Sequence, residues 1–114
     1  MSGVEVVRSV VIDCHVDDVF DYVADPGNDR EWRSADSAAL TCLHSEPPHR
    51  IAWCWEADGD TIEVTFTLEP VWTSTRLTVR QEHRRRRARL LQRARAARDL
   101  DRRLAALRRR LERR

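Results

Sequence analysis

Four potential metal ligands surround a proline-rich turn at residues 47–48: Cys42, His44, His49 and Cys54. Zinc requires three or four such side chains to converge at about 2–2.3 Å, so the pairing of the two flanking strands decides what can meet. Pairing of Ser45 with Arg50 would set Cys42 and His44 on one face and Cys54 on the other. Pairing one residue later would instead set Cys42 opposite Cys54. Neither register unites all four side chains, and we expect no metal site.

The chain lacks the common sequence patterns of covalent and phosphate chemistry. It has no Gly-x-Ser-x-Gly and no His-Glu-x-x-His, and its three glycines form no phosphate loop. General acid–base catalysis requires a titratable group inside a pocket, and His44 would face one in only one of the two registers. An acidic run is explained mainly by a helix start or a solvated face: Asp13, Asp17, Asp18, Asp21 and Asp25. We assign no catalytic residue and no cofactor, and catalysis stays uncertain with the balance against it.

Charge divides the chain into two unequal parts. Residues 1–80 carry 15 acidic residues and 6 arginines, whereas residues 81–114 carry 4 acidic residues and 15 arginines. A basic segment of this kind indicates RNA or an anionic membrane surface as a partner. All 21 basic residues are arginine, however, which is also the result of a coding bias towards GC-rich codons. The arginines therefore support an alternative function without deciding it.

Alternating apolar residues predict the strands that must position these side chains. Residues 4–13 are rich in β-branched side chains and predict a strand, and residues 40–82 predict antiparallel strands joined by turns at 46–49 and 58–60. The clearest alternation places Ile62, Val64 and Phe66 on one face, with threonine and glutamate on the other. Such a pattern is typical of an antiparallel sheet with one covered face. Trp72 falls in a turn, where we expect it to contact solvent or a partner.

Helical spacing marks two further segments. Residues 16–32 predict a helical segment, interrupted at 25–27 by Asp-Pro-Gly, with Trp32 packed back onto it. Residues 84–113 predict a long C-terminal helix with apolar positions every seven residues: Leu90, Ala97, Leu104 and Leu111. This helix has three interpretations: a closing helix with a solvated polar face, an electrostatic module, or a coiled coil with a second copy.

The order of these segments resembles the START-like (SRPBCC) superfamily, and within it the polyketide cyclase/dehydrase branch. The resemblance rests on five stretches taken in order: the Val-Val-Ile-Asp at 10–13, VFDYVADP at 19–26 followed by Asn28 and Glu31-Trp32, EPPHRIAW at 46–53, TRLTVR at 75–80, and residues 98–107. It covers nearly the whole chain of 114 residues as a single domain. The chain departs from the family by having only seven residues between Trp32 and Leu40, where a further hairpin is usual. We therefore expect about two fewer strands and an exposed sheet edge near Leu40.

The resemblance implies an α+β helix-grip fold, in which a curved antiparallel sheet of about five strands packs on the C-terminal helix. It also implies an apolar cavity between them that binds a lipid or polyketide-like molecule, with cyclase-like action as an enzymatic form. The residues expected to line this site are aromatic: Tyr22, Trp32, Trp53, Trp55 and Phe66. The same side chains would fill a core if no cavity exists. Self-association through the sheet edge or the C-terminal helix is expected as well.

Targeting and redox features are few. No apolar run approaches the ~20 residues that span a bilayer, and the N-terminus has neither a basic start nor an apolar signal core. The three cysteines form no Cys-x-x-Cys and cannot all pair. We therefore expect a cytoplasmic protein with reduced thiols.

Overall fold

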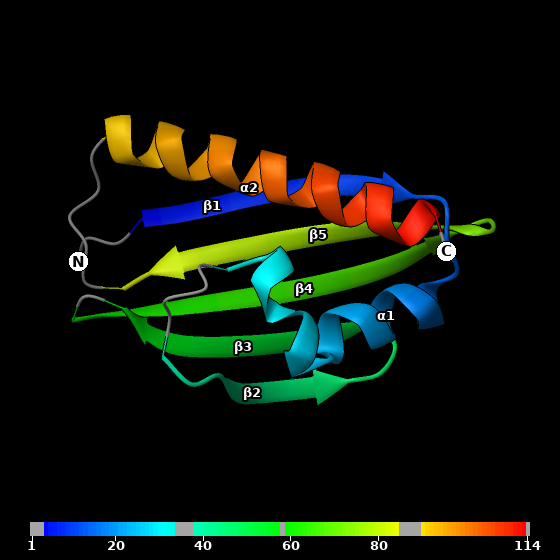
Figure 1. Cartoon of the computed structure of the whole chain (residues 1–114), viewed down its shortest axis with the longest axis horizontal. Coiled ribbons are helices and arrows are strands. Elements are labelled where there is room, and N and C mark those ends of the chain that lie inside the picture. Colours follow the sequence, from blue (N-terminus) through cyan, green and yellow to red (C-terminus); the bar gives the residue numbers. More distant parts are fainter. Residues whose placement is uncertain (1–3, 34–37, 58, 85–89, 114) are drawn as a thin grey trace.

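The computed structural model describes residues 4–33, 38–57, 59–84 and 90–113, which form one antiparallel sheet covered on one face by helices (Figure 1). The strand order is β1-β5-β4-β3-β2. In chain order the elements are β1 (Val4–Ile12), α1 (Val16–Ala24), the 3-10 helix η1 (Pro26–Glu31), β2 (Thr41–Glu46), β3 (Arg50–Ala57), β4 (Asp60–Val71), β5 (Ser74–His83) and α2 (Leu90–Glu112). The expected α+β helix-grip architecture is confirmed.

Alternation in the central strands produces a one-sided core. In β4 the side chains of Ile62, Val64, Phe66 and Leu68 are buried, and the threonines and glutamates between them are more exposed. The neighbouring β5 buries Leu77 on the same face, directly opposite Leu68. Antiparallel sheets that are covered on one face show this pattern, so the strand prediction is confirmed.

The first helical segment consists of two short helices that end at Trp32. Val19 and Val23 of α1 are fully buried, and α1 packs mainly against β4. Pro26 begins η1, where the Asp25 carboxylate accepts a hydrogen bond from the Gly27 N–H at 2.8 Å. A side-chain acceptor at this position satisfies an N–H that would otherwise lack an intrahelical partner. The predicted interruption of the segment is confirmed. Trp32 is buried, but its ring contacts are with the sheet, at Trp53, Trp55 and Phe66, whereas it was expected to pack onto the helical segment.

The C-terminal helix α2 lies along β1 on the covered face of the sheet (Figure 1). Its buried positions recur every three or four residues: Ala97, Leu100, Leu104, Leu107 and Leu111. The expected start at Arg84 is wrong, because Arg84 follows directly after β5, outside the helix, and its N–H donates to the Thr61 carbonyl of β4 at 3.1 Å. Residues 85–89 and the side chain of Leu90, which were also expected in this helix, lie outside the described part of the chain.

Strand β2 forms an exposed edge of the sheet, as expected from the shortened segment before Leu40. All six of its residues are exposed, and the Leu43 side chain is 51% accessible. The turn that joins β4 to β5 contains Trp72, which is 98% exposed and has a φ of 58°. The prediction of a surface position for Trp72 is confirmed.

The described helices include none that is long and apolar enough to cross a membrane.

Candidate ligand site

Four of the five predicted site residues form a buried aromatic cluster between the sheet and η1. The ring of Trp32 stacks on Trp53 with centroids 6.2 Å apart, and contacts Trp55 at 5.9 Å. Phe66 of β4 meets the same indole edge-on at 5.2 Å. Offset and edge-to-face pairs of this kind add about 0.5–1.5 kcal/mol each beyond the burial of their area. Trp32 is therefore the centre of the cluster, and the described rings are in mutual contact.

The polar atoms of the cluster are satisfied unequally. Trp53 Nε1 donates to the Val23 carbonyl of α1 at 3.2 Å. Trp32 is only 2% exposed, and its Nε1 has no hydrogen-bond acceptor among the described residues. An unpaired buried donor costs about 1–3 kcal/mol, and such groups are uncommon in folded proteins. Among the described residues, the Trp32 N–H is therefore a buried donor of this cluster that could bond to an acceptor from outside the chain.

Arg33 closes the cluster on the side of η1, a role that the sequence did not reveal. Its guanidinium lies 5.3 Å from the centre of the Trp55 ring, and its Nη2 is 2.6 Å from the Asp29 carboxylate. Arg33 Nη1 also donates to the Ala38 carbonyl at 2.6 Å. Arg103 of α2 donates to the Arg33 carbonyl at 3.1 Å. The segment from η1 to Arg33 is thus held to both the aromatic cluster and the C-terminal helix.

Tyr22 lies at the border of the site rather than inside it. It is half-buried and packs against the core from α1. The same residue lines a surface groove together with Asn28, Arg110 and Arg113. Its position therefore gives it access both to the apolar core and to solvent.

A second polar cluster, also unforeseen, lies where β4 begins and β5 ends. His83 Nδ1 is 3.6 Å from the Asp60 carboxylate, and both side chains are largely buried. Gln81 Nε2 lies 2.9 Å from His83 Nε2. The sequence predicted Asp60 in a turn and gave no sign of its burial. That burial depends on the pairing of Ile62 with His83 across the sheet, which the sequence alone does not show.

The pairing of β2 with β3 resolves the two possible hairpin registers. Ser45 pairs with Ile51, which is the second of the alternatives, but the register shifts between Cys42 and His44. Cys42 consequently lies opposite Trp53 rather than Cys54. Within the described residues, no three His, Cys, Asp or Glu side chains lie close enough together to hold a metal ion.

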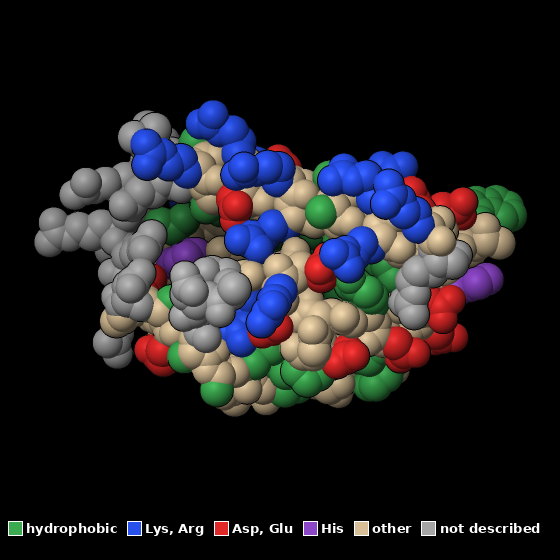
Figure 2. Space-filling view, viewed as in Figure 1, with side chains coloured by type: hydrophobic (Ala, Val, Ile, Leu, Met, Phe, Trp, Pro, Cys, Tyr) green, Lys and Arg blue, Asp and Glu red, His purple; other side chains and the backbone are tan. Residues whose placement is uncertain are grey.

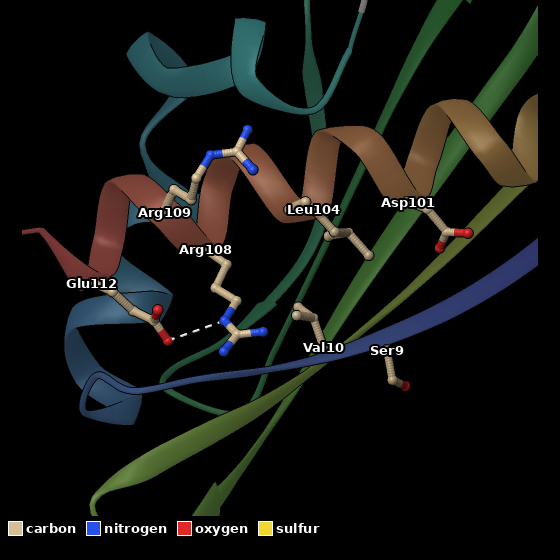
Figure 3. A pocket seen from close by; sticks show the side chains of 8 residues that line it. Ser9, Val10, Asp101, Leu104, Arg108, Arg109 and Glu112 are labelled. Atoms are coloured by element: carbon tan, nitrogen blue, oxygen red, sulfur yellow. Dashed lines mark hydrogen bonds and ion pairs between the residues drawn. The ribbon is translucent and has the colours of Figure 1, made fainter.

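A groove of about 380 Å³ runs between β1 and α2 (Figure 3). Its charges are balanced and partly paired: Arg108 Nε lies 3.2 Å from the Glu112 carboxylate, and Asp101 lies 3.1 Å from Arg8. Glu112 also accepts the Asp13 backbone N–H at 2.8 Å. This bond, assisted by Arg108, lowers the pKa of Glu112 against the opposing effect of desolvation. These interactions hold α2 to β1 and to Asp13, the residue that follows β1.

Comparison with known proteins gives one family. Residues 8–112 match the sequence profile of the family described as "Activator of Hsp90 ATPase homolog 1-like protein". No curated protein matches the chain.

Solved structures share the fold at low sequence identity. CalU16 from Micromonospora echinospora is 18% identical with a TM-score of 0.69, and the match covers 89% of this chain and 71% of that one. The Aha1 dimer from Colwellia psychrerythraea is 15% identical with a TM-score of 0.69, covering 98% and 97% of the two chains. DynU16, from the dynemicin biosynthetic locus, is 23% identical with a TM-score of 0.74, covering 98% of this chain and 48% of that one.

These matches refine the resemblance seen in the sequence. The superfamily is the one expected from the order of the motifs, but the matching family is the AHSA1-like one rather than the cyclase branch. With 105 residues matched in order, from 8 to 112, the profile covers nearly all of the chain. The chain belongs to the AHSA1-like family of the SRPBCC/START-like helix-grip superfamily.

Proposed function

We propose that the protein binds a hydrophobic small molecule, of the lipid or polyketide-like class, at the aromatic cluster between the sheet and η1. The observation that carries this proposal is the buried N–H of Trp32, which has no acceptor in the part of the chain that the structure describes and lies in a mainly apolar cluster. Ligand sites are mostly apolar and contain a few polar groups that fix orientation. A ligand carbonyl, hydroxyl or carboxylate beside Trp32 Nε1 would satisfy this donor.

Binding requires movement, because the described rings already contact one another. Trp32 follows η1 and lies outside the sheet, whereas Trp53, Trp55 and Phe66 belong to strands held by sheet hydrogen bonds. A ligand would therefore enter by displacing Trp32 and loosening the contacts of Arg33. A ligand can select such an open state only by its better affinity for it.

Binding, rather than turnover, is the activity that these residues support. The polyketide-cyclase-like reaction is its enzymatic form, in which the walls of the site would fold a flexible substrate into a reactive shape. We assign no catalytic side chain to that reaction.

The experiment uses cis-parinaric acid as a lipid probe and 1,3,6,8-tetrahydroxynaphthalene as a polyketide-like probe. The indole N–H signal of Trp32 in a ¹⁵N–¹H spectrum should shift on saturation with at least one of them. Trp32→Phe should weaken that probe about fivefold, the value of one hydrogen bond of about 1 kcal/mol. The control Trp72→Phe changes a fully exposed indole and should leave affinity unchanged. Shifts confined to Trp72, or no saturable shift with either probe, would refute the proposal.

We also propose that a second copy of the chain pairs with the exposed edge of β2. The Colwellia Aha1 structure is described as a dimer, and an unpaired strand offers backbone donors and acceptors to another chain. The register shift near Leu43 shortens the regular part of that edge, so we expect weak association.

A further inference from the structure

A concave, positively charged surface lies on the side of α2 that faces η1. A groove of about 400 Å³ there is lined by Arg30, Glu31, Asp99, Arg102, Arg103, Ala106 and Arg109. A second groove of about 510 Å³ continues towards α1 and the end of α2, lined by Tyr22, Asn28, Arg110 and Arg113. The ion pair of Glu31 with Arg110, at 3.1 Å, joins the two. Figure 2 shows arginine side chains gathered over this part of the molecule.

The acids of the groove are already occupied. Asp99 pairs with Arg103 at 2.9 Å and lies 3.5 Å from Arg102, and Glu31 pairs with Arg110. By contrast, Arg30 and Arg109 make no ion pair with any described residue. We refer to Arg30, Arg102 and Arg109 as the arginine triad. The one described ion pair of the triad is that of Arg102 with Asp99, a carboxylate that Arg103 also occupies. The groove therefore carries unneutralised positive charge.

The helix geometry explains why this charge is concave. Arg102, Ala106, Arg109 and Arg113 follow one another at intervals of four, three and four residues, and such spacing places them on one stripe of a helix. The small Ala106 leaves a floor between the two triad arginines of α2, and Arg30 approaches from η1. The stripe from Arg102 to Arg113 is about 16 Å long at 1.5 Å per residue.

Helix-dipole effects account for only part of this arrangement. Cations in the last turn of a helix are stabilised by its negative end, which accounts for Arg109 and Arg110. Arg102 lies more than two turns before that end, and Arg30 belongs to another helix. The groove on the other flank of α2, which Arg109 also lines, has balanced charges, since it holds Asp101 and Glu112 beside Arg108 and Arg109 (Figure 3). The excess of charge is therefore specific to the η1 side.

We propose that the arginine triad binds a small molecule carrying two or more linked phosphate groups. Planar guanidinium groups donate paired hydrogen bonds to phosphate oxygens, and three of them surround one floor of ligand size. The adjoining groove, with Arg110 and Arg113, would take a further phosphate or the remainder of the molecule. A small ligand fits better than RNA, since Glu31 and Asp99 lie within the groove and Asp101 and Glu112 lie on the opposite flank of α2.

The test compares pyrophosphate with inorganic phosphate by calorimetry and by arginine Nε signals. Pyrophosphate should bind saturably and more tightly than phosphate, with shifts at the triad. Arg102→Gln combined with Arg109→Gln should weaken it about tenfold or more, since hydrogen bonds to charged groups are strong. The control is Arg93→Gln with Arg95→Gln, an equal charge loss at exposed positions of the same helix without described ion pairs. It should change affinity less than about twofold.

Three outcomes would overturn the proposal. Equal weakening by both double variants would show non-specific attraction to a basic helix. An unstructured RNA that binds more tightly than pyrophosphate, and that both double variants weaken equally, would identify a polyanion surface instead. Absence of saturable pyrophosphate binding at low salt would exclude the site altogether. Pyrophosphate binding is read at the arginine Nε signals and binding of the apolar probes at the Trp32 indole, so failure here is distinguishable from failure of the apolar ligand site.

Discussion

Trp32 and Trp53 permit a matched measurement of what an unpaired buried donor costs. Both indoles are at least 94% buried in the same cluster, and Trp→Phe removes the same atoms from each. Trp53→Phe also removes the hydrogen bond to Val23 and leaves that carbonyl without its indole donor. Trp32→Phe removes a donor that has no partner. The shared loss of ring volume cancels in the comparison, and the difference reports on hydrogen bonding.

The expected difference follows from two costs of opposite sign. Loss of the Trp53 bond and desolvation of its partner should destabilise the fold by about 1–3 kcal/mol. Removal of the orphaned Trp32 N–H should offset the loss of ring volume by a similar amount. Trp32→Phe should therefore be more stable than Trp53→Phe by about 2–6 kcal/mol, the sum of the two contributions. For a domain of this size each kcal/mol corresponds to about 4 °C in Tm.

Urea unfolding followed by far-ultraviolet circular dichroism measures this difference without depending on tryptophan emission. Equal slopes of free energy against urea for both variants would confirm that the comparison concerns the folded state. Equal destabilisation of the two variants would refute the reasoning, because it would mean that Trp32 Nε1 has an acceptor in solution. Such an acceptor would also remove the observation on which the proposed ligand site depends.

Three further predictions concern the periphery. Hydrogen bonding to Asp13 lowers the pKa of Glu112. The stabilising contribution of Glu112 is therefore present above the usual glutamate pKa of about 4.3 and is lost as pH falls through the lower pKa of the folded state. Glu112→Gln should accordingly lower Tm at neutral pH and have a vanishing effect in acid. Leu43→Lys should abolish any concentration-dependent dimer in sedimentation velocity while leaving Tm unchanged, and persistence of the dimer would exclude the β2 edge. Trp72→Gly should raise stability by about 1 kcal/mol in chemical unfolding, since it relieves a left-handed φ at an exposed position; a decrease would show that the indole has a stabilising contact.

Local pattern predicted the elements whose two faces differ most. The alternation in β4 identified its buried face, although the strand begins at Asp60, inside the expected turn, and runs to Val71; the helical spacing around Val19 identified α1. The start of the C-terminal helix was missed because arginine suits a helix and a strand end equally, and only the bond from Arg84 to Thr61 distinguishes them. The shift beside Leu43 was missed for a related reason. A register depends on pairing between strands, and no single strand carries that information.

The aromatic cluster could be grouped from the sequence, whereas its polar neighbours could not, and the reason is physical. Burial of an aromatic ring follows from its own type and spacing, so Trp53, Trp55 and Phe66 could be grouped by strand periodicity. Burial of a charge depends on partners: Arg33 is buried because Asp29, the Ala38 carbonyl and the Trp55 ring surround it. Those partners are distant or unremarkable in sequence. A lone arginine in a loop therefore gives no signal of such a position.

The short helix η1 connects the proposed apolar ligand site with the proposed phosphate site. It turns Trp32 into the core and exposes Arg30 on the groove, within three residues of chain. Arg103 holds the end of this segment to α2 through the Arg33 carbonyl. An apolar ligand that displaced Trp32 would consequently shift Arg30 relative to Arg102 and Arg109. Occupation of one site must then alter affinity at the other by the same factor in both directions, because linkage between binding equilibria is reciprocal.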